Sequence, residues 1–172
     1  HSFPTRRSSD LNIQLALKDQ IIDTVKNIKK HNVGEILNWL LRNQIAKYSL
    51  ANEYYLSTQL TLDHIKKKGL DITKRSIKTK KNEITYEHPI PSKVVFNLIL
   101  KANNENEIIN ILKNTDYIVI LSHHEDEKLR KIGLISSMPK NWKFGDDIFA
   151  RYKLANIKVL QNKIKMSGAI RR

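Results

Sequence analysis

Apolar residues in the first half of the chain repeat with the period of an α-helix. The repeats predict three helices, over residues 14–30, 36–48 and 53–68, and the first two are expected to form an antiparallel hairpin. Gly69 is expected to end the third helix, since glycine readily adopts the left-handed conformation that stops a helix. Trp39 lies on a strongly apolar helix and is expected in the core. The first stripe consists of Leu17, Ile21, Val25 and Ile28, and the second of Ile36, Leu37, Leu40, Leu41, Ile45 and Tyr48.

Short apolar segments bounded by turn residues follow in the second half. Three β-strands are predicted there, over residues 84–86, 116–122 and 157–160. The segment 116–122 gives the clearest signal, because it holds a run of β-branched residues. The first strand runs directly into a Pro-Ile-Pro turn, which no strand interior would tolerate.

Four helices are expected between and after these strands. One is capped by Ser92, whose hydroxyl suits the first turn of a helix. Another follows the polar turn at 103–106. A third, over 123–131, opens with acids that favour the positive end of the helix dipole. The last is capped by Asp146 or Asp147.

These elements predict an α+β fold, in which an N-terminal helical region precedes a small mixed α/β domain with short strands. No internal repeat is visible. The expected divisions are the helical region at 12–70, a basic connector at 71–82, the α+β domain at 83–160 and a basic, frayed tail at 161–172.

The first residues are treated separately. Residues 2–11 read SFPTRRSSDL, which resembles translated sequencing-adapter DNA. Residues 1–11 are therefore expected to be non-native and are left out of the fold prediction.

Lysine and arginine dominate the charge of the chain. It has 31 Lys and Arg against 17 Asp and Glu, which gives +14 at pH 7. Residues 1–82 and 128–172 carry +9 and +10, and they flank an acidic segment, 83–127, of −5. Basic surfaces attract phosphate backbones by Coulomb steering and counterion release, so a nucleic acid, DNA before RNA, is the expected partner. The alternative is a lysine-rich proteome, in which the charge has no specific partner.

The most basic stretch spans residues 66–81, with eight Lys and Arg and a single acid, Asp71. Hydroxyl side chains are interleaved with the cations, and both groups bind phosphate oxygens. A solvated loop is the alternative interpretation. The expected nucleic-acid-binding residues are Lys66, Lys67, Lys68, Lys74, Arg75, Lys78, Lys80 and Lys81.

Several classes of protein are excluded or disfavoured by what the sequence lacks. It has no cysteine, which excludes disulfides and thiolate zinc sites. Its apolar runs are too short to span a bilayer and none has the form of a signal peptide, so a cytoplasmic location is expected. There is no Gly-rich phosphate loop, serine elbow or zincin helix, which argues against nucleotide hydrolysis, esterase chemistry and metalloproteolysis.

Candidate chemistry gathers in the acidic segment. Glu87 and His88 stand at the end of the first predicted strand, just before the rigid proline turn. Further along, His123 and His124 precede the three acids of residues 125–127, where a strand becomes a helix. Neutral imidazole titrates near physiological pH, so it suits either proton transfer or metal binding.

The segments 85–91 and 116–129 resemble the HNH (His-Me finger) endonucleases. That family places an acid or His, then His, an aliphatic residue and Pro on a strand, and a later His at the start of a helix that follows an apolar strand. The resemblance covers only these two segments. It implies a metal-dependent endonuclease that hydrolyses DNA phosphodiester bonds, in a restriction, phage-defence or mobile-element setting.

The resemblance also implies roles for individual residues. His88 would be the general base that activates water, with Glu87 beside it. His123 or His124, together with Glu87, would hold a divalent ion, and Glu125 is a further candidate ligand. The implied ion is Mg²⁺ or Mn²⁺, with Zn²⁺ as a third candidate.

Other interpretations remain open from the sequence. His88 can simply finish a strand with its ring hydrogen-bonded to the backbone, and residues 123–127 can be an exposed, capped helix start. Asp146 and Asp147 can form an N-cap with an intrahelical pair to Arg151. Two other functions fit the composition: a non-catalytic DNA- or RNA-binding regulator, and a structural or assembly protein of a phage or mobile element. The assembly function would require a large exposed apolar patch.

Overall fold

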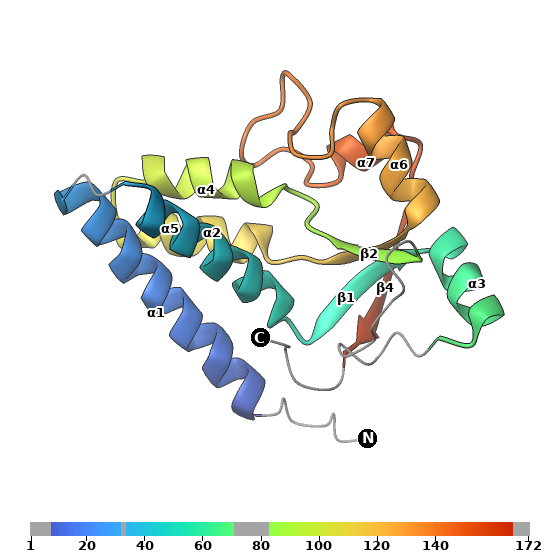
Figure 1. The fold of residues 1–172 in the computed structure, drawn as a ribbon, viewed down its shortest axis with the longest axis horizontal. Coiled ribbons are helices and arrows are strands. Elements are labelled where there is room, and N and C mark those ends of the chain that lie inside the picture. Colours follow the sequence, from blue (N-terminus) through green and yellow to red (C-terminus); the bar gives the residue numbers. More distant parts are fainter. Residues whose placement is uncertain (1–7, 32–33, 71–82, 167–172) are drawn as a thin grey trace.

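The computed structural model describes residues 8–31, 34–70 and 83–166 (Figure 1). Two helices form the N-terminal part, α1 (Ser8–His31) and α2 (Glu35–Leu50), and they pack against each other as the predicted hairpin. Figure 1 shows α4 (Ser92–Lys101) and α5 (Glu105–Thr115) beside this hairpin. Together these four helices enclose the largest hydrophobic core. Its fully buried members include Ile21, Leu41, Ile99 and Leu112.

A four-stranded mixed sheet forms the other half of the molecule, in the order β2-β3-β1-β4. The two central strands, β1 (Tyr54–Thr58) and β3 (Val119–Ser122), are parallel. The outer strands, β2 (Ile84–Glu87) and β4 (Val159–Lys165), each pair antiparallel with their neighbour. The predicted α+β class is thereby confirmed.

Alternate residues of the central strands supply two cores on opposite faces of the sheet. Tyr55 and Ile120 belong to one core, which α3 (Gln59–Lys68) covers with Ile65. Leu56 and Leu121 belong to the other, which α6 (His123–Lys131) and α7 (Ala150–Leu154) cover. This alternation follows from the two-residue period of a strand. Burial on both faces explains why the first three residues of β3, Val119 to Leu121, are all apolar.

The prediction of one helix over 53–68 is wrong in its first half, and 12–70 is therefore not purely helical. Residues Tyr54–Thr58 form β1, and the helix begins only at Gln59. The Tyr-Tyr-Leu-Ser-Thr segment is rich in aromatic and hydroxylated residues that fit a pleated surface. Its pairing with both β3 and β4 outweighs the helical spacing of its apolar residues. Gly69 does end α3, with φ 63°.

The C-terminal boundary also differs from the prediction. The last described strand begins at Val159 and continues to Lys165, and so takes in the first five residues of the segment that was expected to be a frayed tail. Three consecutive polar residues, Gln161 to Lys163, are exposed on this edge strand. They interrupt the alternation of apolar and polar residues by which a strand is recognised in a sequence, so the strand was not predicted there. Backbone pairing with β1 holds this segment in place, and the main-chain N–H of Met166 still donates to the carbonyl of Glu53 (2.8 Å).

Two predicted caps are wrong. Ser92 is the first helical residue of α4, and Pro91 holds the cap position, since proline's fixed φ suits the start of a helix. Phe149, rather than Asp146 or Asp147, precedes α7. Asp147 instead accepts a hydrogen bond from the Phe149 N–H (3.0 Å) and pairs with Lys153 (2.8 Å).

Trp39 is 67% exposed and not in the core as predicted. The buried face of α2 is centred on Leu41, Ile45 and Tyr48, so Trp39 lies on the opposite side of the helix. Ile36 (81% exposed) lies on that outer side as well.

Two further expectations concerned the first eleven residues and the absence of a membrane span. α1 begins at Ser8, so it includes residues 8–11 of the segment expected to be non-native. Among the described residues, no helix is both long enough and apolar enough to cross a membrane.

Candidate functional site

The two central strands end at the same edge of the sheet, because they are parallel. Each leads directly into a helix: β1 into α3 and β3 into α6. Thr58 caps α3 by accepting a hydrogen bond from the Thr61 N–H (3.0 Å). Ser122 caps α6 in a capping box with Glu125. The positive ends of two helix dipoles therefore meet at this edge.

The Glu125 carboxylate fills the space between these two helix starts. It is 3% exposed, and its Oε2 accepts from the hydroxyls of Thr58 (2.9 Å), Thr61 (2.6 Å) and Ser122 (2.8 Å). The backbone N–H of Ser122 donates to the same oxygen (3.1 Å). An anion is stabilised at such a point by the converging donors. Glu125 is thus an internal structural anion, which removes it from the predicted metal ligands.

A different group on α6 could hold a metal ion. Ligand atoms of His123, Asp126 and Glu127 all lie within 4.8 Å of one another. His123 is half exposed, and its Nε2 lies 4.0 Å from Oε1 of Glu127. Arg130 pairs with both acids, at 3.2 Å from Asp126 and 3.3 Å from Glu127, so much of their negative charge is already balanced.

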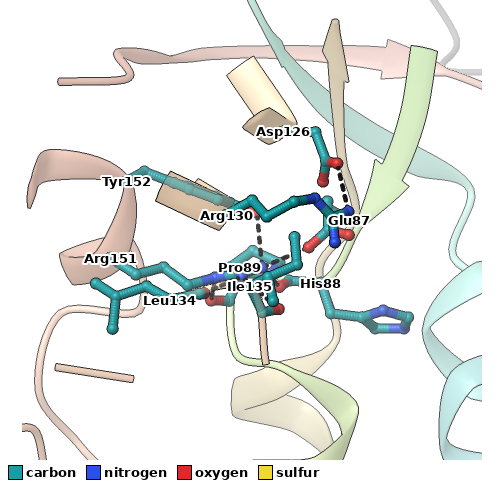
Figure 2. A network of polar contacts seen from close by, with 9 residues as sticks. All are labelled: Glu87, His88, Pro89, Asp126, Arg130, Leu134, Ile135, Arg151 and Tyr152. Carbon is teal, nitrogen blue, oxygen red and sulfur yellow. Dashed lines mark hydrogen bonds and ion pairs between the residues drawn. The ribbon is translucent and has the colours of Figure 1, made fainter. Parts of the chain in front are cut away.

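Glu87 belongs to a network centred on Arg151, which Figure 2 shows beside Asp126 and Arg130. The Arg151 side chain is completely buried, and its Nη2 donates to Oε2 of Glu87 at 2.7 Å. Its other donors reach the carbonyls of Pro89, Leu134 and Ile135 at 2.9–3.1 Å, and that of His88. Burial raises the pKa of Glu87, and the adjacent guanidinium opposes that rise. The ion pair therefore fastens the end of β2 to α7.

His88 turns away from this network, and Figure 2 shows its ring pointing to the side opposite Arg151. The ring is hydrogen-bonded to the backbone of Ala46 in α2. Burial lowers the pKa of His88 to about 4, with a further decrease from the charge of Arg151. Nε2 is buried and has no hydrogen-bond partner among the described residues. A base with so low a pKa accepts a proton weakly at neutral pH.

The structure therefore separates the residues that the nuclease resemblance brought together. Glu87 and His88 diverge, and neither belongs to the metal-type group found among the residues that are described. His124 is exposed next to that group but is not part of it. Of the predicted metal ligands only His123 is in the group, joined by Asp126 and Glu127.

The predicted nucleic-acid-binding residues fall into two sets. Lys66, Lys67 and Lys68 form the exposed last turn of α3, and Figure 1 shows this helix at the end of the molecule farthest from α1. Lys68 lies 3.9 Å from Glu83. The second set, outside the described residues, consists of Lys74, Arg75, Lys78, Lys80 and Lys81.

Two of these arrangements had weak signals in the sequence. Ser122-x-x-Glu125 has the form of a capping box, which indicates an inward role for Glu125. Arg151 lies directly between Ala150 and Tyr152, and these apolar neighbours are a weak signal that it is buried. Its pairing with Glu87 was not, because the two residues are brought together only by the tertiary fold.

Comparison with known proteins does not identify the chain by similarity. No protein-family model, no curated protein and no solved structure matches it.

Proposed function

We propose that the protein binds a nucleic acid, DNA in the first instance, in the cytoplasm and through its basic surface. The observation that carries the proposal is the last turn of α3. Three consecutive lysines, Lys66 to Lys68, are exposed there, and only Lys68 has an acid within ion-pair distance in the described part of the chain. The net charge of +14 adds long-range attraction for a polyanion.

Binding of this kind is measurable through its salt dependence. Each phosphate neutralised by a lysine releases condensed counterions, and the logarithm of the binding constant then falls by roughly 0.9 per phosphate for each tenfold rise in salt. Three lysines in phosphate contact contribute up to about three to that slope. The contribution is independent of base sequence, because phosphates position a protein without specifying a sequence.

The test replaces Lys66, Lys67 and Lys68 with glutamine and measures binding to a fluorescent DNA duplex over a series of salt concentrations. The matched control replaces three exposed lysines of α4 and α5, Lys93, Lys101 and Lys113, so that both proteins lose the same charge. We expect the α3 variant to lose affinity and slope, and the control to change far less. Equal losses would mean that only total charge matters, and absence of binding in the unsubstituted protein would disprove the proposal.

A metal-dependent endonuclease is the second candidate. The supporting observation is the group of His123, Asp126 and Glu127, whose ligand atoms are close enough to share one divalent ion. An ion there would activate water and stabilise charge on the phosphate. Arg130 would first have to release the two acids. The His88 and Glu87 roles are not part of this candidate, since both side chains have structural partners.

Plasmid cleavage tests this second candidate. Supercoiled DNA is incubated with the protein in Mg²⁺, Mn²⁺, Zn²⁺ or EDTA, beside His123→Ala and the control His31→Ala, an exposed histidine at the end of α1. Metal-dependent nicking that His123→Ala abolishes and His31→Ala retains would support a nuclease at this group. Binding with no nicking under any metal would leave the binding function alone.

A further inference from the structure

A hollow of about 300 Å³ opens on the surface where α7 turns into β4. It lies outside both the α6 group and the last turn of α3. Its walls come from one continuous segment of chain. The lining residues are Phe149, Lys153, Asn156, Ile157, Lys158, Val159 and Gln161.

The backbone around this hollow is held in a fixed shape. Asn156 has φ 53°, which ends α7 in the left-handed conformation that asparagine tolerates better than most residues. The Ile157 N–H donates to the carbonyl of Tyr152 (2.8 Å), and the Asn156 N–H to that of Lys153 (3.1 Å). The site is thus largely formed before any ligand arrives, which reduces the ordering cost of binding.

The walls combine three kinds of chemistry. Phe149 is half-buried, and its ring stacks on buried Tyr152 with centroids 6.3 Å apart, while Ile157 and Val159 add apolar surface. Asn156 and Gln161 are exposed amides, each with a donor and an acceptor. Lys153 and Lys158 are exposed cations.

Lys158 carries the electrostatic part of the argument. Lys153 is already paired with Asp147, whereas no ion pair of Lys158 is seen in the parts of the chain that are described. Its charge is therefore available to a ligand. An apolar and aromatic wall beside amides and a free cation matches a ligand that has a flat ring, polar ring edges and a phosphate.

We propose that this hollow binds one unpaired nucleotide of a single-stranded nucleic acid. The base packs against Phe149 and the aliphatic wall, the amides contact its edge, and Lys158 contacts its phosphate. The inference rests on the proposed nucleic-acid-binding function and adds a site that prefers single strands. In a duplex the base faces are stacked and the pairing edges are occupied, so only an unpaired nucleotide offers both to a protein.

The size of the hollow agrees with a single nucleotide unit. Small-molecule sites occupy roughly 300–1,000 Å³, so about 300 Å³ lies at the lower end of that range.

The experiment compares the affinity of the full chain for a single-stranded 12-nucleotide DNA and a duplex of the same length. Lys158→Gln is matched with Lys163→Gln, an exposed lysine on β4 outside the hollow, so that each removes one charge from the same region. Phe149→Leu removes the aromatic ring and keeps apolar volume, and thermal unfolding checks its fold. A free nucleoside monophosphate is added as a competitor, which separates recognition of one nucleotide from general attraction to a strand.

We expect Phe149→Leu and Lys158→Gln each to weaken single-strand binding about fivefold or more. For Phe149→Leu, about fivefold is the lower end of the range for loss of one base–aromatic stack. Duplex affinity should change no more than in Lys163→Gln. The monophosphate should compete in the unsubstituted protein and in Lys163→Gln, but not in the two variants of the hollow. Equal single-strand losses for Lys158→Gln and Lys163→Gln, with no competition, would overturn the site while leaving the binding function intact. Failure to bind either DNA would overturn both proposals.

Discussion

At the scale of single residues, Arg151 is one of the largest fully buried side chains in the described structure. A guanidinium has five N–H donors in a planar fork, and all five are used here, on one carboxylate and four carbonyls. These acceptors belong to the end of β2, to the turn after it and to the loop after α6. One side chain therefore holds three segments together.

Replacing Arg151 should destabilise the protein strongly. Arg151→Met leaves the Glu87 carboxylate without its ion partner and four carbonyls without donors, and we expect a loss of about 3–5 kcal/mol in the free energy of unfolding. Arg151→Lys should recover little of it, because an ammonium cannot reproduce the fork. Urea denaturation measures both.

The control for this prediction is Lys153→Met, two residues further along the same helix, where the side chain is 74% exposed. A change within about 0.5 kcal/mol is expected there. A comparable loss in Lys153→Met, or full stability in Arg151→Lys, would show that the network is not what holds α7 in place.

His88 makes the stability depend on pH. The folded protein keeps the imidazole neutral down to its pKa of about 4, whereas the unfolded chain protonates it near the ordinary value of 6.5. The unfolded state therefore binds the proton first as pH falls, and stability decreases between pH 6.5 and pH 4. The expected contribution is a loss of about 2 kcal/mol from pH 7.5 to pH 5.

Urea denaturation at both pH values, on the unsubstituted protein and on His88→Phe, measures this contribution. The variant should lose less stability on acidification by that amount, while His124→Phe, the same change at an exposed position, should behave as the unsubstituted protein does. Identical pH profiles in all three would contradict the buried, neutral state of His88.

At the scale of elements, two strand–helix units are joined through one carboxylate. β1 with α3 and β3 with α6 have the same order and direction, and Glu125 accepts hydrogen bonds from the start of each helix. The carboxylate thus occupies the position at which a phosphate would otherwise be attracted by two helix N-termini.

Glu125→Ala should therefore uncouple the two units. Loss of a buried capping box and of the hydrogen bonds to a charged acceptor is expected to cost about 3 kcal/mol or more. Glu127→Ala, on the same helix but partly exposed, should cost less than about 1 kcal/mol, since exposed ion pairs contribute little. Equal costs in thermal or urea unfolding would refute the coupling.

The elements also show which sequence signals were sufficient to predict a helix or a strand. Long periodic stripes located α1 and α2, and the β-branched run located β3. β1 was missed because the apolar spacing of its five residues is also compatible with a helix. These residues form a strand because they pair with β3 and β4. For the candidate site, the sequence placed Glu87 at the end of a strand and His123 at the start of a helix, as the structure has them. It could not give side-chain directions, and these separate Glu87 from His88 and turn Glu125 inward.

At the scale of the whole molecule, the positive charge and the α+β class were both predictable, but the arrangement of charges and strands was not. Composition alone gives +14, whereas the exposure of Lys66 to Lys68 depends on where α3 ends. The predicted division between a helical region and a later domain does not follow the cores. α1 and α2 share their core with α4 and α5, and β1 lies at the centre of the sheet.

The place of β4 in the sheet leads to a prediction for the whole chain. A chain ended after Asn156 lacks the strand that covers the outer edge of β1, and we expect it to lose cooperative unfolding. A chain ended after Met166 keeps that strand and should unfold as the full chain does. Urea denaturation followed by circular dichroism distinguishes the two, and cooperative unfolding of the shorter chain would contradict the requirement for β4.

The strand order also sets the sequence of events during synthesis on the ribosome. β1 leaves the ribosome early, but its partners are β3, which begins at Val119, and β4, which ends at Lys165. Until β3 has emerged, β1 has two open edges that can pair with other nascent chains, and one edge stays open until β4 has emerged. The long separation of the partners favours slow folding that is completed only after β4 has emerged, since distant contacts must overcome the entropy of closing large loops. A cell producing this protein must therefore protect β1 from aggregation until β4 has emerged.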